Sequence, residues 1–145
     1  MKKKSIAIRI LAEPEVVIEE EGEVSIIFSY PVELDLSDKE KTEKQIENLV
    51  QGKPQYFPLT GAQMAICGVG LLESYAYNPV ATEIAHAAKA IHPAETITGD
   101  VLIMPVDSEK LSSSIQDCIK EMCSLMAQLI ANEGGFFEID FEKIQ

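Results

Sequence analysis

The sequence predicts an α+β fold, with a mostly antiparallel sheet, two helices packed on one face of that sheet and a third helix on the surface. Short segments near both ends of the chain alternate apolar with polar residues, which is the pattern of a strand. Two longer segments, residues 79–91 and 109–132, repeat apolar residues at helical spacing. Because strands and helices follow one another in mixed order, a partly parallel sheet is the main alternative.

The length and composition predict a single α+β domain covering residues 1–145. The chain is 46% hydrophobic and 25% charged, which is near the average for soluble domains. A chain of this size buries enough surface to be stable without disulfides. Within the domain we expect an N-terminal acidic hairpin over residues 5–29, a core over residues 37–105, and a C-terminal helix and strand over residues 107–142.

The N-terminal segments predict strands. Ser5–Ala12 places isoleucines on one face, and Glu13-Pro14 is expected to end this strand because proline lacks an N–H. β-branched residues are frequent in residues 15–19 and 23–29, on either side of Gly22. This arrangement predicts a hairpin with an exposed tip.

The next segments predict an irregular stretch followed by a helix. Tyr30–Leu36 is expected to be irregular or a short edge strand, because Pro31 cannot donate a ladder hydrogen bond. Ser37-x-x-Glu40 is a capping box that opens a helix reaching about residue 51, and Gly52 suits the position after its end. Its narrow apolar stripe predicts a surface helix; the stripe consists of Ile46, Leu49 and Val50.

The middle of the chain is rich in apolar residues and in turn residues. Tyr56–Leu59 and Ala62–Cys67 predict two strands, and Leu71–Tyr77 predicts a third after a glycine-containing turn. A helix over residues 60–74 is the alternative, but each of its two central glycines would cost it about 1 kcal/mol. Asn78 and Pro79 suit the N-cap and first position of a helix that reaches Ile91.

The last third of the chain predicts a strand, the longest helix and a final strand. Gly99–Met104 is expected to be a buried strand. Asp107 or Ser108 is expected to cap a helix over Glu109–Asn132, which carries a wide apolar stripe. The alternation that predicts the final strand places three apolar residues on one face, namely Phe137, Ile139 and Phe141.

The charge of the chain narrows the class of its partners. The net charge is -12, from 24 acidic and 12 basic residues. This balance argues against direct contacts with nucleic-acid phosphates and against an anionic membrane surface, and it suits a basic protein partner. The candidate partner-binding residues are the acids of the N-terminal hairpin: Glu13, Glu15, Glu19, Glu20, Glu21 and Glu23.

The cysteines and histidines predict neither a metal site nor catalysis. Cys67, Cys118 and Cys123 are odd in number and form no C-x-x-C pair, so we expect reduced thiols in a cytoplasmic protein. His86 and His92 are six residues apart, about 240° around one helix, so they cannot chelate one ion together. We therefore expect no catalytic residues, no metal and no cofactor, and we expect that the protein is not an enzyme.

A small-ligand site is the alternative to a protein-binding surface. Phosphate and carboxylate pockets favour arginine, and Arg9 is the only arginine of the chain. Glycine-bearing turns could approach such a ligand closely through the backbone. The candidate ligand-binding residues for a nucleotide signal are Arg9, Lys53, Gly68, Gly70 and Gly99.

Short motifs in the middle of the chain resemble a known family. They are Met64-Ala65-Ile66-Cys67, Gly70-Leu71-Leu72, the segment Tyr77–Thr82 that includes Asn78-Pro79, and the Gly99–Ile103 strand. Over residues 43–104 the chain resembles domain-of-unknown-function family 3846, a family of small phage and mobile-element proteins. The resemblance implies a compact α+β fold and a phage or plasmid context. It carries over no activity and no functional residues.

The sequence therefore favours a non-enzymatic acidic interaction protein, a phage or mobile-element accessory that binds a host factor, with nucleotide binding or sequestration as the alternative. A homodimer is also expected. Leu125 lies outside the main apolar stripe of its helix, and Phe136 lies on the face of the final strand opposite Phe137. Such surplus apolar surface is usually buried by a second copy of the chain.

Overall fold

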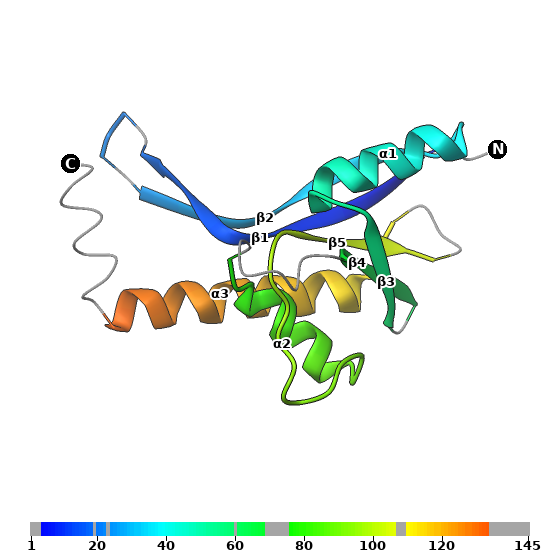
Figure 1. Cartoon of the computed structure of the whole chain (residues 1–145). Helices are drawn as coiled ribbons and strands as arrows, with labels where there is room; N and C mark the ends of the chain where they lie inside the picture. The colour runs from blue at the N-terminus through cyan, green and yellow to red at the C-terminus, as the bar shows by residue number, and fades with distance from the viewer. Residues whose placement is uncertain are drawn as a thin grey trace.

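A computed structural model describes residues 4–18, 20–22, 24–59, 61–68, 76–106 and 110–133 (Figure 1). Its elements, in chain order, are β1 (Lys4–Ile18), β2 (Val24–Asp35), α1 (Lys39–Val50), β3 (Pro54–Leu59), β4 (Ala62–Cys67), α2 (Pro79–Ala87), β5 (Val101–Pro105) and α3 (Ser113–Glu133). The described strands form one sheet in the order β2-β1-β5-β4-β3, and all its neighbours are antiparallel. The predicted α+β class is confirmed, and the partly parallel alternative is wrong for these strands.

Helices cover both faces of the sheet. Figure 1 shows α2 and α3 on one side and α1 on the other. The larger core joins the first pair of helices to the sheet, and it includes Ile10, Met64, Val80, Ile103 and Ile119. The smaller core lies under α1 and includes Ala7, Leu34, Ile46, Val50 and Leu102. The narrow stripe predicted for α1 thus covers the second face, where each fully buried aliphatic side chain contributes about 1.5–3 kcal/mol.

The N-terminal hairpin is longer and more continuous than predicted. The expected break at Glu13-Pro14 is wrong, because β1 runs on to Ile18. Ile10 pairs with Ser29, and Glu15 pairs with Ile27, so β1 inserts extra residues at this point as a bulge. A bulge leaves residues outside the ladder, and Pro14 fits there without disrupting it.

The segment Tyr30–Leu36 is also more regular than expected. Up to Asp35 it is part of β2, a strand of 12 residues, rather than irregular or short. Pro31 pairs with Ile8 inside this strand. Proline is tolerated there because β2 is an edge strand, where one side of the backbone has no ladder to complete.

The ends of α1 differ from the prediction by one residue each. Asp38, rather than Ser37, is the N-cap, and its carboxylate accepts a hydrogen bond from Glu40 N at 2.9 Å. Ser37 instead donates its N–H to Asp35 Oδ1 at 2.9 Å. At the other end Gln51 takes the left-handed conformation expected of Gly52, with φ of 63°.

The other two helices also begin or end differently. The predicted cap and first position of α2, Asn78 and Pro79, are confirmed. The helix stops at Ala87 rather than Ile91, because Lys89 takes a left-handed φ of 57°. α3 begins at Ser113 rather than Glu109, since Lys110 forms a bridge with Ile6.

Several predicted features lie wholly or partly outside the described residues. Residues 71–75 of the predicted strand Leu71–Tyr77 lie outside the described residues. Tyr77, at the end of that predicted strand, forms an isolated bridge with Thr98. The candidate caps Asp107 and Ser108 also lie outside, as does the whole final strand with Phe136, Phe137, Ile139 and Phe141. Among the candidate site residues, the same holds for Glu19, Glu23 and Gly70.

Candidate functional site

The candidate site is a cavity where β1 separates from β5. β1 pairs with β5 through Ile8–Ile10, and Asp100 immediately precedes β5. Beyond this point β1 continues into the bulge, which leaves a hollow of about 350 Å³ beside it. The hollow is lined by Arg9, Leu11, Ala12, Glu13, Glu15, Gln51, Ala76, Gly99 and Asp100. It therefore brings two of the candidate ligand-binding residues, Arg9 and Gly99, together with two of the candidate partner-binding residues, Glu13 and Glu15.

Arg9 is held by polar groups of Tyr30 in β2 and of Asp100 just before β5. Its Nη2 donates to Asp100 Oδ2 at 2.9 Å, and its Nη1 donates to the hydroxyl of Tyr30. The guanidinium carbon also lies 5.8 Å from the centre of the Tyr30 ring, within cation–π range. The Arg9 and Asp100 side chains are each only 17% exposed. A partly buried pair with these hydrogen bonds fixes the arginine in place.

Asp100 links Arg9 to the bulge. Its second oxygen, Oδ1, accepts a hydrogen bond from the backbone N–H of Ala12 at 2.9 Å. One carboxylate thus neutralises the arginine and binds the N–H of Ala12, two residues beyond Ile10, the last β1 residue paired with β5. Asp100 therefore marks the end of the β1–β5 ladder and the beginning of the cavity.

The charge of the cavity is negative. Glu13, Glu15 and Asp100 supply three carboxylates against the single guanidinium of Arg9. An anionic ligand would meet an arginine whose charge is already compensated and two exposed glutamates beside it. The cavity therefore favours a cationic group.

The remaining candidate residues lie elsewhere. Gly68 donates its N–H to the carbonyl of Lys53 at 2.8 Å, at the open end of the β3–β4 pair. A Cβ on Gly68 would lie 3.1 Å from that carbonyl oxygen, which explains a glycine there without a ligand. Glu20 and Glu21 lie exposed at the tip of the β1–β2 hairpin. None of these four residues lines the cavity.

The histidines and cysteines have structural contacts. A ring nitrogen of His86 hydrogen-bonds the carbonyl of Glu95 at 2.8 Å, and His92 Nδ1 accepts from Ala94 N at 3.1 Å. Cys67 is buried on β4. Burial raises the pKa of the Cys123 thiol, an effect that its contact with Ser29 partly offsets. A protonated thiol is a poor nucleophile, so Cys123 is suited to packing.

The structure does not assemble a metal centre within the residues it describes, since no three His, Cys, Asp or Glu side chains there are placed to hold an ion. None of the helices in that part of the chain combines the length and the apolarity that a membrane crossing requires.

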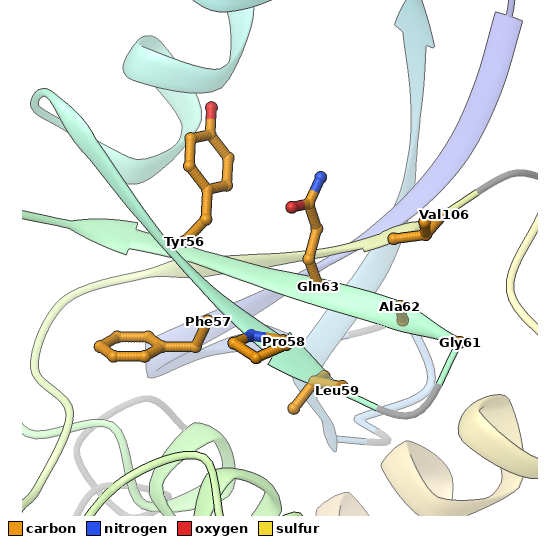
Figure 2. A pocket seen from close by; sticks show the side chains of 8 residues that line it. All are labelled: Tyr56, Phe57, Pro58, Leu59, Gly61, Ala62, Gln63 and Val106. Atoms are coloured by element: carbon orange, nitrogen blue, oxygen red, sulfur yellow. The ribbon is translucent and has the colours of Figure 1, made fainter.

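A second hollow lies at the β3–β4 hairpin (Figure 2). It measures about 330 Å³ and is lined by Tyr56, Phe57, Pro58, Leu59, Gly61, Ala62, Gln63 and Val106. Figure 2 shows the side chains of Tyr56 and Gln63 on one side of the hairpin and that of Phe57 on the other. Partial burial, with Glu43 and Glu47 nearby, raises the pKa of Tyr56. None of the described residues that line this hollow is acidic or basic, whereas Arg9, Glu13, Glu15 and Asp100 line the cavity beside β1.

Sequence reasoning missed the two side chains that hold Arg9. A lone arginine in an acidic chain predicts an acidic partner, but 24 acidic residues were available. Asp100 is distant in sequence, and only the sheet order brings it beside β1. Tyr30 lies in the segment for which an irregular conformation was expected, although it pairs with Arg9 across the ladder.

Comparisons of the chain with protein-family models, with curated proteins and with solved structures give no match. The resemblance to domain-of-unknown-function family 3846 therefore stays a prediction.

Proposed function

We propose that the protein is a non-enzymatic protein-binding module that docks a basic partner through its acidic arm. The acidic arm is the part of the β1–β2 hairpin beyond the β1–β5 ladder, residues 13–18, 20–22 and 24–27. The observation that carries the proposal is the exposure of all four of its described glutamates on this projecting ribbon: Glu13, Glu15, Glu20 and Glu21 (Figure 1).

The arm is braced, which suits a preformed binding surface. An isolated two-stranded ribbon is marginal in water. Here Ile26 of β2 packs against the same core as Met122 and Met126 of α3. Figure 1 shows α3 running beneath the arm. A braced arm loses less conformational freedom on binding than a free loop, and this favours affinity.

The arm carries both charged residues that attract a basic partner and apolar residues that the partner can contact. Its glutamates would steer a basic partner toward it and speed association. Val17 and Ile18 are 39% and 42% exposed among these charges, and they offer apolar surface that a partner could bury. A cytoplasmic location and a host factor as partner belong to the same proposal, supported by the free thiols and by the family resemblance.

Nucleotide binding, the alternative that the sequence left open, has less support. Arg9 is paired with Asp100, and the cavity beside it is negative. A nucleotide phosphate would have to displace that pair or accept two neighbouring glutamates. Thermal unfolding with added nucleotides tests this alternative, because a ligand that binds only the folded state raises Tm.

The experiment for the acidic arm is affinity capture from a lysate of the source cells at about 50 mM and 500 mM NaCl, over which range salt screens charge strongly. One variant replaces Glu13, Glu15, Glu20 and Glu21 with glutamine. The control replaces four exposed glutamates of α1 and α2 in the same way: Glu40, Glu43, Glu47 and Glu83.

We expect the wild type and the control to retain the same protein at low salt, and the arm variant to lose it. The wild type should also lose it at high salt. Retention by the arm variant, or no retained protein at low salt, would contradict the proposal.

A further inference from the structure

We propose that the partner adds a strand to β1 over Glu15–Ile18, on the side that faces away from β2, and that this strand is an extended, basic segment of a protein. This inference rests on the proposed function and specifies how the acidic arm binds. Strand addition joins backbone groups at an open sheet edge, while side chains of the added strand supply specificity. Three stretches of strand bear on this proposal: β3, the C-terminal half of β2, and β1 beyond its ladder with β5.

The β3 edge is blocked by prolines. Gly68 N donates to Lys53 O, so the pair formed by these residues is hydrogen-bonded. Hydrogen-bonded and non-hydrogen-bonded pairs alternate along an antiparallel ladder. Pro54, Tyr56 and Pro58 therefore direct their backbone groups away from β4, toward the open side. Two of these three residues lack an N–H, which protects the edge against an added strand.

The C-terminal half of the β2 edge is covered by α1. Gln45 Nε2 donates to Glu33 O at 2.8 Å, and Gln45 Oε1 accepts from Asp35 N at 3.2 Å. The hydroxyl of Thr42 donates to Asp35 O. Pro31 lies in the same strand and has no N–H. Side chains of α1 thus occupy the positions that an added strand would need.

The β1 edge is different. Ile8–Ile10 pair with β5, and Ala12 N is taken by Asp100. Beyond the bulge, within the part of the chain that the structure describes, β2 alone pairs with Glu15–Ile18. Backbone groups of a strand point alternately to its two sides, so part of this segment directs donors and acceptors away from β2.

The cavity provides space along this same edge. Its volume is about 350 Å³, and Ala12, Glu13 and Glu15 of β1 line it. A chain segment extending the β1 edge would enter the cavity and meet Glu13 and Glu15. Lysine or arginine side chains of that segment would pair with these carboxylates, whereas Arg9 already has Asp100.

The charge also decides between possible occupants. A second copy of this chain would bring its own glutamates against Glu13 and Glu15, and like charges directly opposite each other on adjacent strands repel. Nucleic acid would be repelled by the same carboxylates. A basic extended segment can hydrogen-bond the backbone groups of β1 and pair its own charges with the glutamates. Its apolar side chains can cover Val17 and Ile18.

The test uses synthetic peptides of about eight residues that alternate lysine and valine, which is enough for one strand. A second peptide has the same sequence but is N-methylated at about four consecutive central residues, so it keeps its charge and loses donors on both edges. Binding is measured by fluorescence anisotropy at about 50 mM NaCl, where charge attraction is little screened. Backbone hydrogen exchange locates the bound peptide.

We expect the unmethylated peptide to bind about tenfold or more tightly than the methylated one, because each lost hydrogen bond weakens the complex. Binding should protect amides within Glu15–Ile18. Glu13→Gln/Glu15→Gln should weaken binding of both peptides, and the control Glu43→Gln/Glu47→Gln should leave it unchanged.

The outcomes separate the two proposals. Equal binding of the two peptides, or protection at another edge, overturns strand addition while leaving charge-driven docking of the arm in place. Absence of binding by the unmethylated peptide overturns strand addition as well. Failure of the lysate experiment with intact peptide binding would instead count against the proposed function and not against an open β1 edge.

Discussion

The side chain of Asn78 joins three parts of the fold. Its side chain is fully buried. Its Nδ2 donates to Ile10 O at 3.2 Å and to Gly99 O at 2.9 Å, and its Oδ1 accepts from Ala81 N at 3.0 Å. An amide is needed here, because the position requires two donors and one acceptor. The Asn78-Pro79 motif is thus explained by the joining of β1, α2 and the segment before β5.

We expect Asn78→Ala to lower the free energy of unfolding by about 2–4 kcal/mol, because it removes a helix cap and leaves buried backbone groups without partners. Urea denaturation followed by circular dichroism measures this change. Asn48→Ala, at an exposed position of α1, is the control and should change stability by less than about 0.5 kcal/mol. Equal stability of the two variants would refute the structural role of Asn78.

At the residue scale, local chemistry was predictable and long-range partners were not. The cap at Asn78 follows from its own side chain and the proline after it. The choice of Asp38 over Ser37 does not, because both residues can cap, and Asp35 binds the Ser37 N–H. The partner of Arg9 depends on the sheet order, which no local pattern contains.

At the scale of elements, the strands themselves were predictable while their limits were not. Alternation located β1, but a proline inside it predicted an end where the structure has a bulge. The apolar face of α2 continues to Ile91 in sequence, yet the helix ends earlier because Lys89 adopts a left-handed conformation. The candidate cavity depends on that bulge, so its lining could not be assembled from the sequence.

The edge protection of β3 gives a prediction at this scale. Pro58→Thr restores an N–H on the open side of β3, and threonine suits a strand. We expect this variant to associate into larger species as concentration rises, measured by light scattering, because open edges pair with one another. Pro93→Thr lies in an exposed turn and should scatter like the wild type. Unchanged scattering by Pro58→Thr would show that proline is not what prevents the β3 edges of two molecules from pairing.

For the whole molecule, two kinds of association should respond oppositely to salt. Binding of a basic partner by the acidic arm depends on unlike charges and weakens as salt rises. Association of two copies, each with a net charge of -12, is opposed by charge and should strengthen with salt. Salt dependence therefore identifies which surface is in use.

The predicted homodimer belongs to this scale, and α3 offers the surface for it. Leu125 is 52% exposed on the outer face of the helix. A shallow hollow surrounds it, lined by Lys120, Glu121, Ser124, Leu125 and Gln128. A leucine that no described element covers is suited to burial against its copy in a symmetric pair of helices. The acidic arm would remain free for its partner.

Light scattering at micromolar concentration should give the mass of two chains, with the dimer fraction rising as salt is added. Leu125→Glu should shift the mass to one chain, because it places a charge where apolar surface would be buried. Ser114→Glu adds the same charge at an exposed position near the start of α3 and should leave the dimer intact. A mass of one chain for the wild type, unchanged by dilution or salt, would rule the dimer out.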